Sequence, residues 1–130
     1  MTGWLLLSYA TLFAQGDQPL LRLRSQLPLP SSFITDVWGY VDAATGTEYA
    51  LVGADGLVIV DVSDASNPQQ VAHMRDAHGF DIKVWQNYAY TVNGSGSRGD
   101  GLIVDLSDPA NPALVGSFPT AHNIFIDANG

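Results

Sequence analysis

Two histidines, His78 and His122, lie 44 residues apart, and each directly follows an alanine. Imidazole nitrogens bind divalent metals, and a carboxylate from Asp81 or Asp127 would extend the ligand set. The same spacing has a structural interpretation, in which a histidine at the entrance of each repeat ties neighbouring strands by a hydrogen bond. We prefer that structural interpretation. The candidate metal ligands of the alternative are His78, His122, Asp81 and Asp127.

Four aspartates recur at the same spacing, as the pairs Asp61 with Asp105 and Asp64 with Asp108. Carboxylate oxygens suit calcium, but the dense Asp alternation of a helix–loop–helix calcium loop is absent. Asp61 and Asp105 would also have to lie within about 5 to 10 Å of each other to act as an acid–base pair. Aspartates bond readily to their own backbone and cap turns, and we prefer that role. We expect no cofactor, with calcium or another divalent metal as the alternative.

The elements that position these residues are given by a repeat. The segment 56–68, Gly-Leu-Val-Ile-Val-Asp-Val-Ser-Asp-Ala-Ser-Asn-Pro, returns at 101–112 as Gly-Leu-Ile-Val-Asp-Leu-Ser-Asp-Pro-Ala-Asn-Pro. The spacing is 44 to 45 residues, because the second copy has lost one residue inside its apolar run. A β-rich unit of this length is typical of a four-stranded propeller blade.

Each repeat contains four short apolar runs that are separated by Gly, Asn, Asp and Pro, and no window has sustained helical periodicity. The runs are 34–41, 49–53, 57–62 and 70–74, then 80–85, 88–92, 102–106 and 114–118. The third run of each unit is apolar at consecutive positions, which predicts a strand buried on both faces. The sequence therefore predicts an all-β fold, a partial β-propeller with two four-stranded antiparallel blades plus the start of a third.

The chain divides into five segments. The apolar run 4–14 is too short to span a bilayer and has the length of a signal-peptide core. Residues 21–27 alternate apolar and polar, as an edge strand does. The expected segments are 1–14 a signal peptide, 15–32 a linker with a ring-closing edge strand, 33–74 blade 1, 75–118 blade 2 and 119–130 the truncated start of blade 3.

Composition excludes several classes of function. The chain has no cysteine, which excludes disulfides, thiolate metal sites and cysteine nucleophiles. Its net charge of −8 comes from 13 acidic and 5 basic residues, so a phosphate backbone would be repelled and no nucleic acid partner is expected. The sequence also contains no nucleophile elbow, phosphate-binding loop or His-Glu-x-x-His motif.

The Leu-Val-Ile-Val-Asp core at 57–61, followed by Val-Ser-Asp and Asn-Pro, resembles the LVIVD repeat of β-propeller proteins. The segments 36–42, 48–53 and 81–85 are similar to the opening of the exported "choice-of-anchor B" group, which carries those repeats. The similarity covers about residues 27–127 and implies a secreted or cell-surface propeller without an assigned activity. The first unit departs from the pattern, because Phe33 stands where His78 and His122 align.

These observations favour a non-enzymatic extracellular or surface-anchored β-propeller repeat module for protein or ligand binding. Its expected partners are a protein or cell-surface ligand and the missing blades of its own full-length chain, with no transmembrane helix in this segment. The alternative is a metal-dependent propeller hydrolase or lactonase whose site is completed by missing blades. A third hypothesis is a structural surface module for adhesion or assembly.

Overall fold

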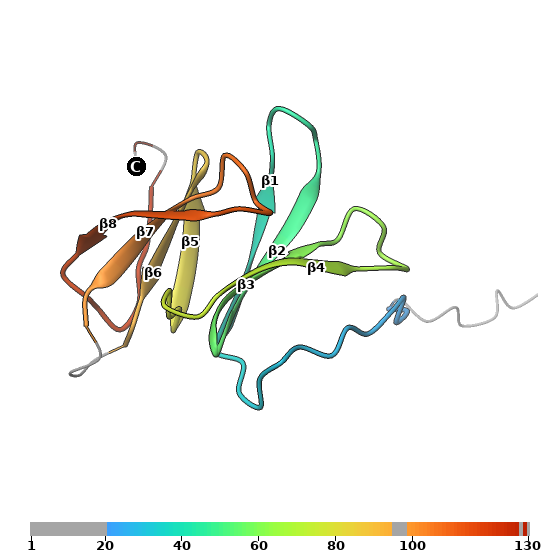
Figure 1. Cartoon of the computed structure of the whole chain (residues 1–130), viewed down its shortest axis with the longest axis horizontal. Coiled ribbons are helices and arrows are strands. Elements are labelled where there is room, and N and C mark those ends of the chain that lie inside the picture. The colour runs from blue at the N-terminus through green and yellow to red at the C-terminus, as the bar shows by residue number, and fades with distance from the viewer. Residues whose placement is uncertain (1–20, 95–98, 128, 130) are drawn as a thin grey trace, which may run out of the picture.

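A computed structural model describes residues 21–94, 99–127 and 129, which form eight antiparallel strands in two four-stranded sheets (Figure 1). The first sheet contains β1 (Asp36–Val41), β2 (Glu48–Ala54), β3 (Gly56–Asp61) and β4 (Gln69–Met74). The second contains β5 (Asp81–Trp85), β6 (Tyr88–Val92), β7 (Gly101–Asp105) and β8 (Ala113–Phe118). The predicted all-β fold with two four-stranded antiparallel units is confirmed. The predicted signal peptide at 1–14 lies outside the described residues.

Both sheets are meanders in which each strand pairs with its neighbour in sequence. The pairing of β3 with β4 shifts register between Ile59 and Val60, and that of β7 with β8 shifts between Ile103 and Val104. The bulges leave Val71 and Val115 at the same position in the two sheets. A shared bulge means that the repeat specifies an irregular backbone detail as well as the strand order.

The repeated aspartates after the third strands form turns. Asp61 accepts the backbone N–H of Ser63 over 2.9 Å, and Asp105 accepts that of Ser107 over 2.8 Å. Asp64 accepts the N–H of Ser66 over 2.9 Å, as Asp108 does for Ala110 over 3.1 Å. The hydrogen bonds agree with the turn-capping interpretation. They lower the pKa of the Asp64, Asp105 and Asp108 carboxyls, chiefly through bonds from Ser66, Ser107 and Asn111 respectively.

The main core lies between the two sheets. Leu51, Leu57 and Ile59 of the first sheet are fully buried in one cluster with Ile82 and Val104 of the second. Because side chains of a strand alternate between its two faces, each sheet contributes one face to this core. Burying such aliphatic side chains stabilises the contact by about 1.5 to 3 kcal/mol each.

The outer faces of the two sheets differ in how fully they are buried. Val52, Val58 and Val60 form a second cluster on the far side of the first sheet, where Leu27 and Leu29 pack against it. All four apolar residues of β3 are therefore buried, as the sequence predicted. In β7, only Val104 is buried among the apolar residues, and Leu102 and Ile103 are half-buried. The prediction of a third strand buried on both faces is correct for the first unit and wrong for the second, because nothing described here covers β7 fully.

The segments that flank the two sheets contain no strand among the residues described at 21–35 and 119–127. The alternating residues 21–27 form no edge strand and instead run beside the first sheet, where Ser25 Oγ donates to the Ala65 carbonyl over 2.7 Å. The start of a third blade at 119–130 stays a prediction. Among the described residues, no helix is long and apolar enough to cross a membrane.

Candidate functional site

A pocket of about 730 Å³ opens at the end of the molecule where β1 and β5 begin and β6 ends. Its lining comes from four separate segments of the chain, and none of the side chains carries a permanent charge. The lining residues are Phe33, Thr35, His78, Gly79, Phe80, Asn93, Gly94 and His122. A concave site with aromatic walls and a few polar groups is the usual form of a ligand pocket.

Three of the lining residues are related by the spacing of the repeat. Phe33 and His78 each lie three residues before the first strand of their sheet, His122 lies 44 residues after His78, and all three line the same pocket. The His122 ring lies against Phe80, with 5.1 Å between the ring centroids and 45° between the planes. The repeat therefore brings residues that are 44 and more positions apart in sequence to one place.

Asn93 supplies the amide group of the pocket. Its Nδ2 donates to the Asp100 carbonyl over 2.7 Å, and its backbone N–H donates to Thr120 Oγ1 over 3.0 Å. Its Oδ1 is buried and has no hydrogen-bond partner among the described residues. A buried acceptor without a donor costs about 1 to 3 kcal/mol, so this side of the pocket wall carries a local cost in stability.

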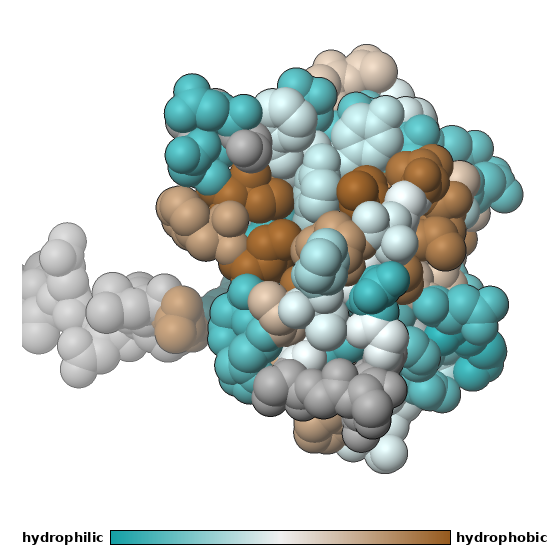
Figure 2. All heavy atoms as spheres, turned by 90° about the vertical axis from the view of Figure 1, so that its left-hand side faces the viewer, coloured by the Kyte–Doolittle hydropathy of each residue, from teal (hydrophilic) through white to brown (hydrophobic). Residues whose placement is uncertain are grey.

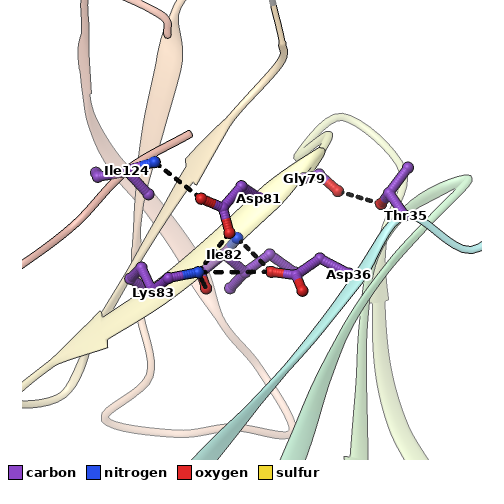
Figure 3. Close-up of polar contacts among 7 residues, drawn as sticks. All are labelled: Thr35, Asp36, Gly79, Asp81, Ile82, Lys83 and Ile124. Carbon is purple, nitrogen blue, oxygen red and sulfur yellow. Dashed lines mark hydrogen bonds and ion pairs between the residues drawn. The ribbon is translucent and has the colours of Figure 1, made fainter. Parts of the chain in front are cut away.

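The wall beside the pocket is made by a close contact between the two sheets. Thr35 Oγ1 donates to the Gly79 carbonyl, as Figure 3 shows. A Cβ built on Gly53 would lie 2.1 Å from that carbonyl oxygen and 2.3 Å from Thr35 Oγ1. Glycine at position 53 is therefore required for this backbone approach.

Below the pocket, one aspartate from each unit accepts a backbone N–H from the next (Figure 3). Asp36, the first residue of β1, accepts the N–H of Ile82 over 2.9 Å. Asp81, the first residue of β5, accepts the N–H of Ile124 over 2.8 Å. The same acceptor position thus links the first unit to the second, and the second unit to residues 121–127.

Lys83 lies between these two carboxylates. Its Nζ contacts Asp81 Oδ1, lies 3.8 Å from Asp36 Oδ2 and sits 4.4 Å from the centroid of the Trp38 ring. Burial raises the pKa of the Asp81 carboxyl, but hydrogen bonds from Lys83 and the Ile124 N–H outweigh burial and hold that pKa below its usual range. Asp81 is therefore a carboxylate whose two oxygens are both engaged by the protein.

The four candidate metal ligands lie in three separate places. His78 and His122 line the pocket and are exposed, whereas Asp81 is buried in the ion pair below it. Asp127 is exposed and accepts the N–H of Asn129 over 2.8 Å. In the part of the chain that the structure describes, no three His, Asp or Glu side chains gather closely enough to hold a metal ion. The metal prediction stays untested for the pair of histidines.

Sequence reasoning missed three parts of the site. Phe33 appeared only as a departure from the repeat, although its alignment with the histidines already indicated its position. Asn93 follows an apolar run directly, and a polar residue at that point is a weak signal for a pocket wall. The role of Asp36 could not be read from the sequence, because its partner is a backbone N–H, which nearly every residue has.

The sequence model of the LVIVD repeat matches residues 44–76 and 77–120, which together make up more than half of the chain. The boundary between the two matches falls between Asp76 and Ala77, in the connection from β4 to β5. No curated protein and no solved structure matches the chain.

Proposed function

The chain belongs to the LVIVD repeat family, and on that premise we propose that it is a non-enzymatic propeller-type module that binds a ligand at the pocket of Phe33, His78 and His122. The ligand is a protein segment or a small molecule with an aromatic or other flat apolar face and a hydrogen-bond donor. The module works outside the cell, secreted or attached to the surface, as in the "choice-of-anchor B" group that the sequence resembles.

The observation that carries this proposal is the convergence of equivalent repeat positions on one pocket. Because a repeat places equivalent residues around one axis, Phe33, His78 and His122 present their rings together to one cavity, where a single ligand can contact all three. The aromatic rings supply stacking surface, and the exposed imidazoles of His78 and His122 supply polar atoms. Among the described lining residues, the one hydroxyl, Thr35 Oγ1, donates to the Gly79 carbonyl and not to a histidine, which favours binding over catalysis.

Residues 119–127 support the view that the array continues. Asp81 accepts the Ile124 N–H at the acceptor position that Asp36 uses for Ile82, with the donor 43 residues after Asp81 and 46 after Asp36. Residues 121–127 therefore lie against the same end of the second sheet as β5 does against the first, in a different register. We therefore treat 119–130 as the opening of a third unit. A further unit would place another equivalent residue beside the same pocket.

The test is a ligand screen by NMR with the isotope-labelled chain and a library of neutral aromatic and sugar-like fragments. We expect the shifted amide and imidazole signals to cluster at His78, Phe80, Asn93, Gly94 and His122. Asn93→Ala and His78→Ala should each weaken the binding of a selected fragment by about tenfold, the loss of one hydrogen bond or ring contact.

His73→Ala is the matched control, because the His73 ring lies outside the pocket and contacts the Asp55 carbonyl. It should leave fragment affinity unchanged. Shifts that scatter over the surface, or an equal loss of affinity in the His73 variant, would contradict the proposal.

A metal-dependent hydrolase or lactonase is the second candidate, and it is favoured by the presence of two histidines in one pocket. Its remaining ligands would come from outside the described residues. Titration with Zn²⁺ would then shift the imidazole signals of His78 and His122 together, at micromolar metal, and the loaded protein would hydrolyse a lactone. Independent shifts at millimolar metal would exclude it.

A further inference from the structure

The pocket at the beginning of β1 and β5 has four ring side chains in its wall. Phe33 and Phe80 are 65% and 40% exposed, and the imidazoles of His78 and His122 are exposed as well. Two of these rings lie against each other, since the centroids of His122 and Phe80 are 5.1 Å apart. The face of an aromatic ring carries partial negative charge, which attracts cations. The wall therefore offers several such faces to one ligand.

The charges around these rings add up to a negative value. Directly below the pocket, the carboxylates of Asp36 and Asp81 share the ammonium group of Lys83, which leaves one negative charge in excess (Figure 3). This cluster adjoins the pocket wall, because Thr35 precedes Asp36 in the chain and donates to the carbonyl of Gly79 in that wall. The whole chain has a net charge of −8, and such a field attracts cations to the surface.

The described lining residues include no Lys or Arg that would repel a cation, and no Asp or Glu that would pair with one. A cation in the pocket would therefore be held by ring faces and by the surrounding field. Ring faces favour a weakly hydrated cation, because a strongly hydrated one loses hydration that a ring does not replace. The guanidinium group is flat and weakly hydrated, stacks on aromatic faces and donates N–H groups to acceptors such as imidazole nitrogens.

We infer that this pocket binds a guanidinium group, carried by an arginine side chain of a partner protein. The inference rests on the proposed function and names the chemical class of its ligand. The guanidinium stacks on an exposed phenyl ring, and an imidazole nitrogen accepts one of its N–H groups. The pocket volume of about 730 Å³ accommodates an arginine side chain together with the peptide groups beside it.

The experiment is an NMR titration of the whole isotope-labelled chain with arginine, citrulline and lysine, each blocked as the Nα-acetyl amide, at one salt concentration. Citrulline has the shape of arginine but carries a neutral urea group, and lysine keeps the charge without the flat group. We expect arginine to bind about tenfold more tightly than citrulline and about threefold more tightly than lysine. The shifted signals should belong to His78, Phe80, Gly94 and His122.

Phe33→Leu removes one ring face and keeps an apolar side chain at an exposed position. It should weaken the binding of blocked arginine by about fivefold and that of blocked citrulline by less. The melting temperature of the variant checks that the sheets are retained.

Phe125→Leu is the matched control, because Phe125 is 85% exposed and lies with Trp85 and Phe118 on the outer side of the second sheet. Figure 2 views the molecule from that side and shows hydrophobic side chains gathered there, with hydrophilic ones around them. This variant should leave the affinity for blocked arginine unchanged.

Several outcomes would overturn the inference. They are equal affinities for arginine and citrulline, equal affinities for arginine and lysine, equal losses in the two variants, and shifted signals at Trp85 and Phe118 in place of the pocket. Tighter binding of free arginine than of blocked arginine would show that the ligand is a small molecule and not a protein side chain.

The titration also separates this inference from the proposed function. If neutral aromatic fragments shift the pocket signals and arginine does not, the guanidinium ligand is wrong and the pocket remains a binding site. If neither shifts them, the inference and the proposed function both fail.

Discussion

The two sheets share strand order, the position of the bulge and the turns after the third strand, yet their central strands are buried to different degrees. In β3, every residue from Gly56 to Val60 is buried. In β7, Leu102 and Ile103 remain half-buried. The strand pairing, bulge and turns of each sheet are therefore specified within the repeat. The burial of its apolar residues depends instead on the segments that pack against its two faces.

The polar contacts between units show the same contrast. Asp36 joins two complete sheets, since its carboxylate accepts the N–H of Ile82 at the start of β5. Asp81 uses the equivalent position to hold residues 121–127, which form no strand. The same acceptor position thus contributes to the global stability in one place and to local order in the other.

The largest effect is expected from charges placed on opposite faces of β7. Val104→Asp would bury an unpaired carboxylate in the core between the sheets, which costs several kcal/mol and prevents folding. Ile103→Asp, one residue away, faces the open side and should still fold. Soluble yield and circular dichroism measure both. If the two variants behave alike, the two faces of β7 are equivalent and the contrast between the sheets is lost.

A smaller loss of stability is expected when the hydrogen bond from Ile82 to Asp36, which joins the two complete sheets, is removed. Asp36→Ala leaves the Ile82 N–H without its acceptor and should lower the free energy of unfolding by about 2 kcal/mol. Asp81→Ala should instead raise the amide exchange rate of Ile124 with a lesser effect on global unfolding. Urea denaturation and hydrogen exchange distinguish these results. Equal global losses would mean that residues 121–127 fold together with the sheets.

The cover on the first sheet can be removed without touching a strand. Leu27→Ser combined with Leu29→Ser exposes the cluster of Val52, Val58 and Val60 and should cost about 1 to 2 kcal/mol, because both leucines are only half-buried. The first sheet would then have an open face like that of the second. Binding of a dye for apolar surface should increase, and Leu21→Ser, at a side chain that is 90% exposed, should not change it.

Acid should affect the second sheet through Asp81. Its folded-state pKa is below the ordinary 3.8, so its contribution is fully present above that value and is lost as the pH falls through the folded-state pKa. Stability measured by urea denaturation should therefore decline below about pH 4, and Asp81→Asn should flatten part of that decline. An unchanged pH profile in the variant would show that Asp81 does not gain stability from its ionised form.

The smallest effect is expected at the turns, where the sheets do not differ. Asp64→Ala and Asp108→Ala each remove one side-chain bond to the backbone at an exposed turn. The two variants should lower the melting temperature slightly and by the same amount, since these contacts are local. Unequal shifts in melting temperature would show that the packing around each sheet also affects the stability of its turn.

The features that were predicted from sequence are the local ones. The Gly, Asn, Asp and Pro residues between the apolar runs placed all eight strands, because turns depend on residues within a few positions. The convergence of the histidines was within reach, since a repeat places equivalent residues around one axis. The cover by Leu27 and Leu29 was not, because the segment 21–27 alternates like a strand and only a tertiary contact decides otherwise. The unpartnered Asn93 Oδ1 likewise depends on which donors fold near it.

The bonds of Asp36 and Asp81 have a direction along the chain that bears on synthesis. In each, the acceptor precedes its donor by more than 40 residues, and the whole of one sheet lies between them or is completed first. As the polypeptide leaves the ribosome, the four strands of the first sheet emerge before Ile82, so we expect the Asp36 carboxylate to be in place to accept the N–H of the incoming strand. Each unit therefore offers a hydrogen-bond acceptor to the segment that is synthesised after it, and we expect the units to assemble in the order of translation.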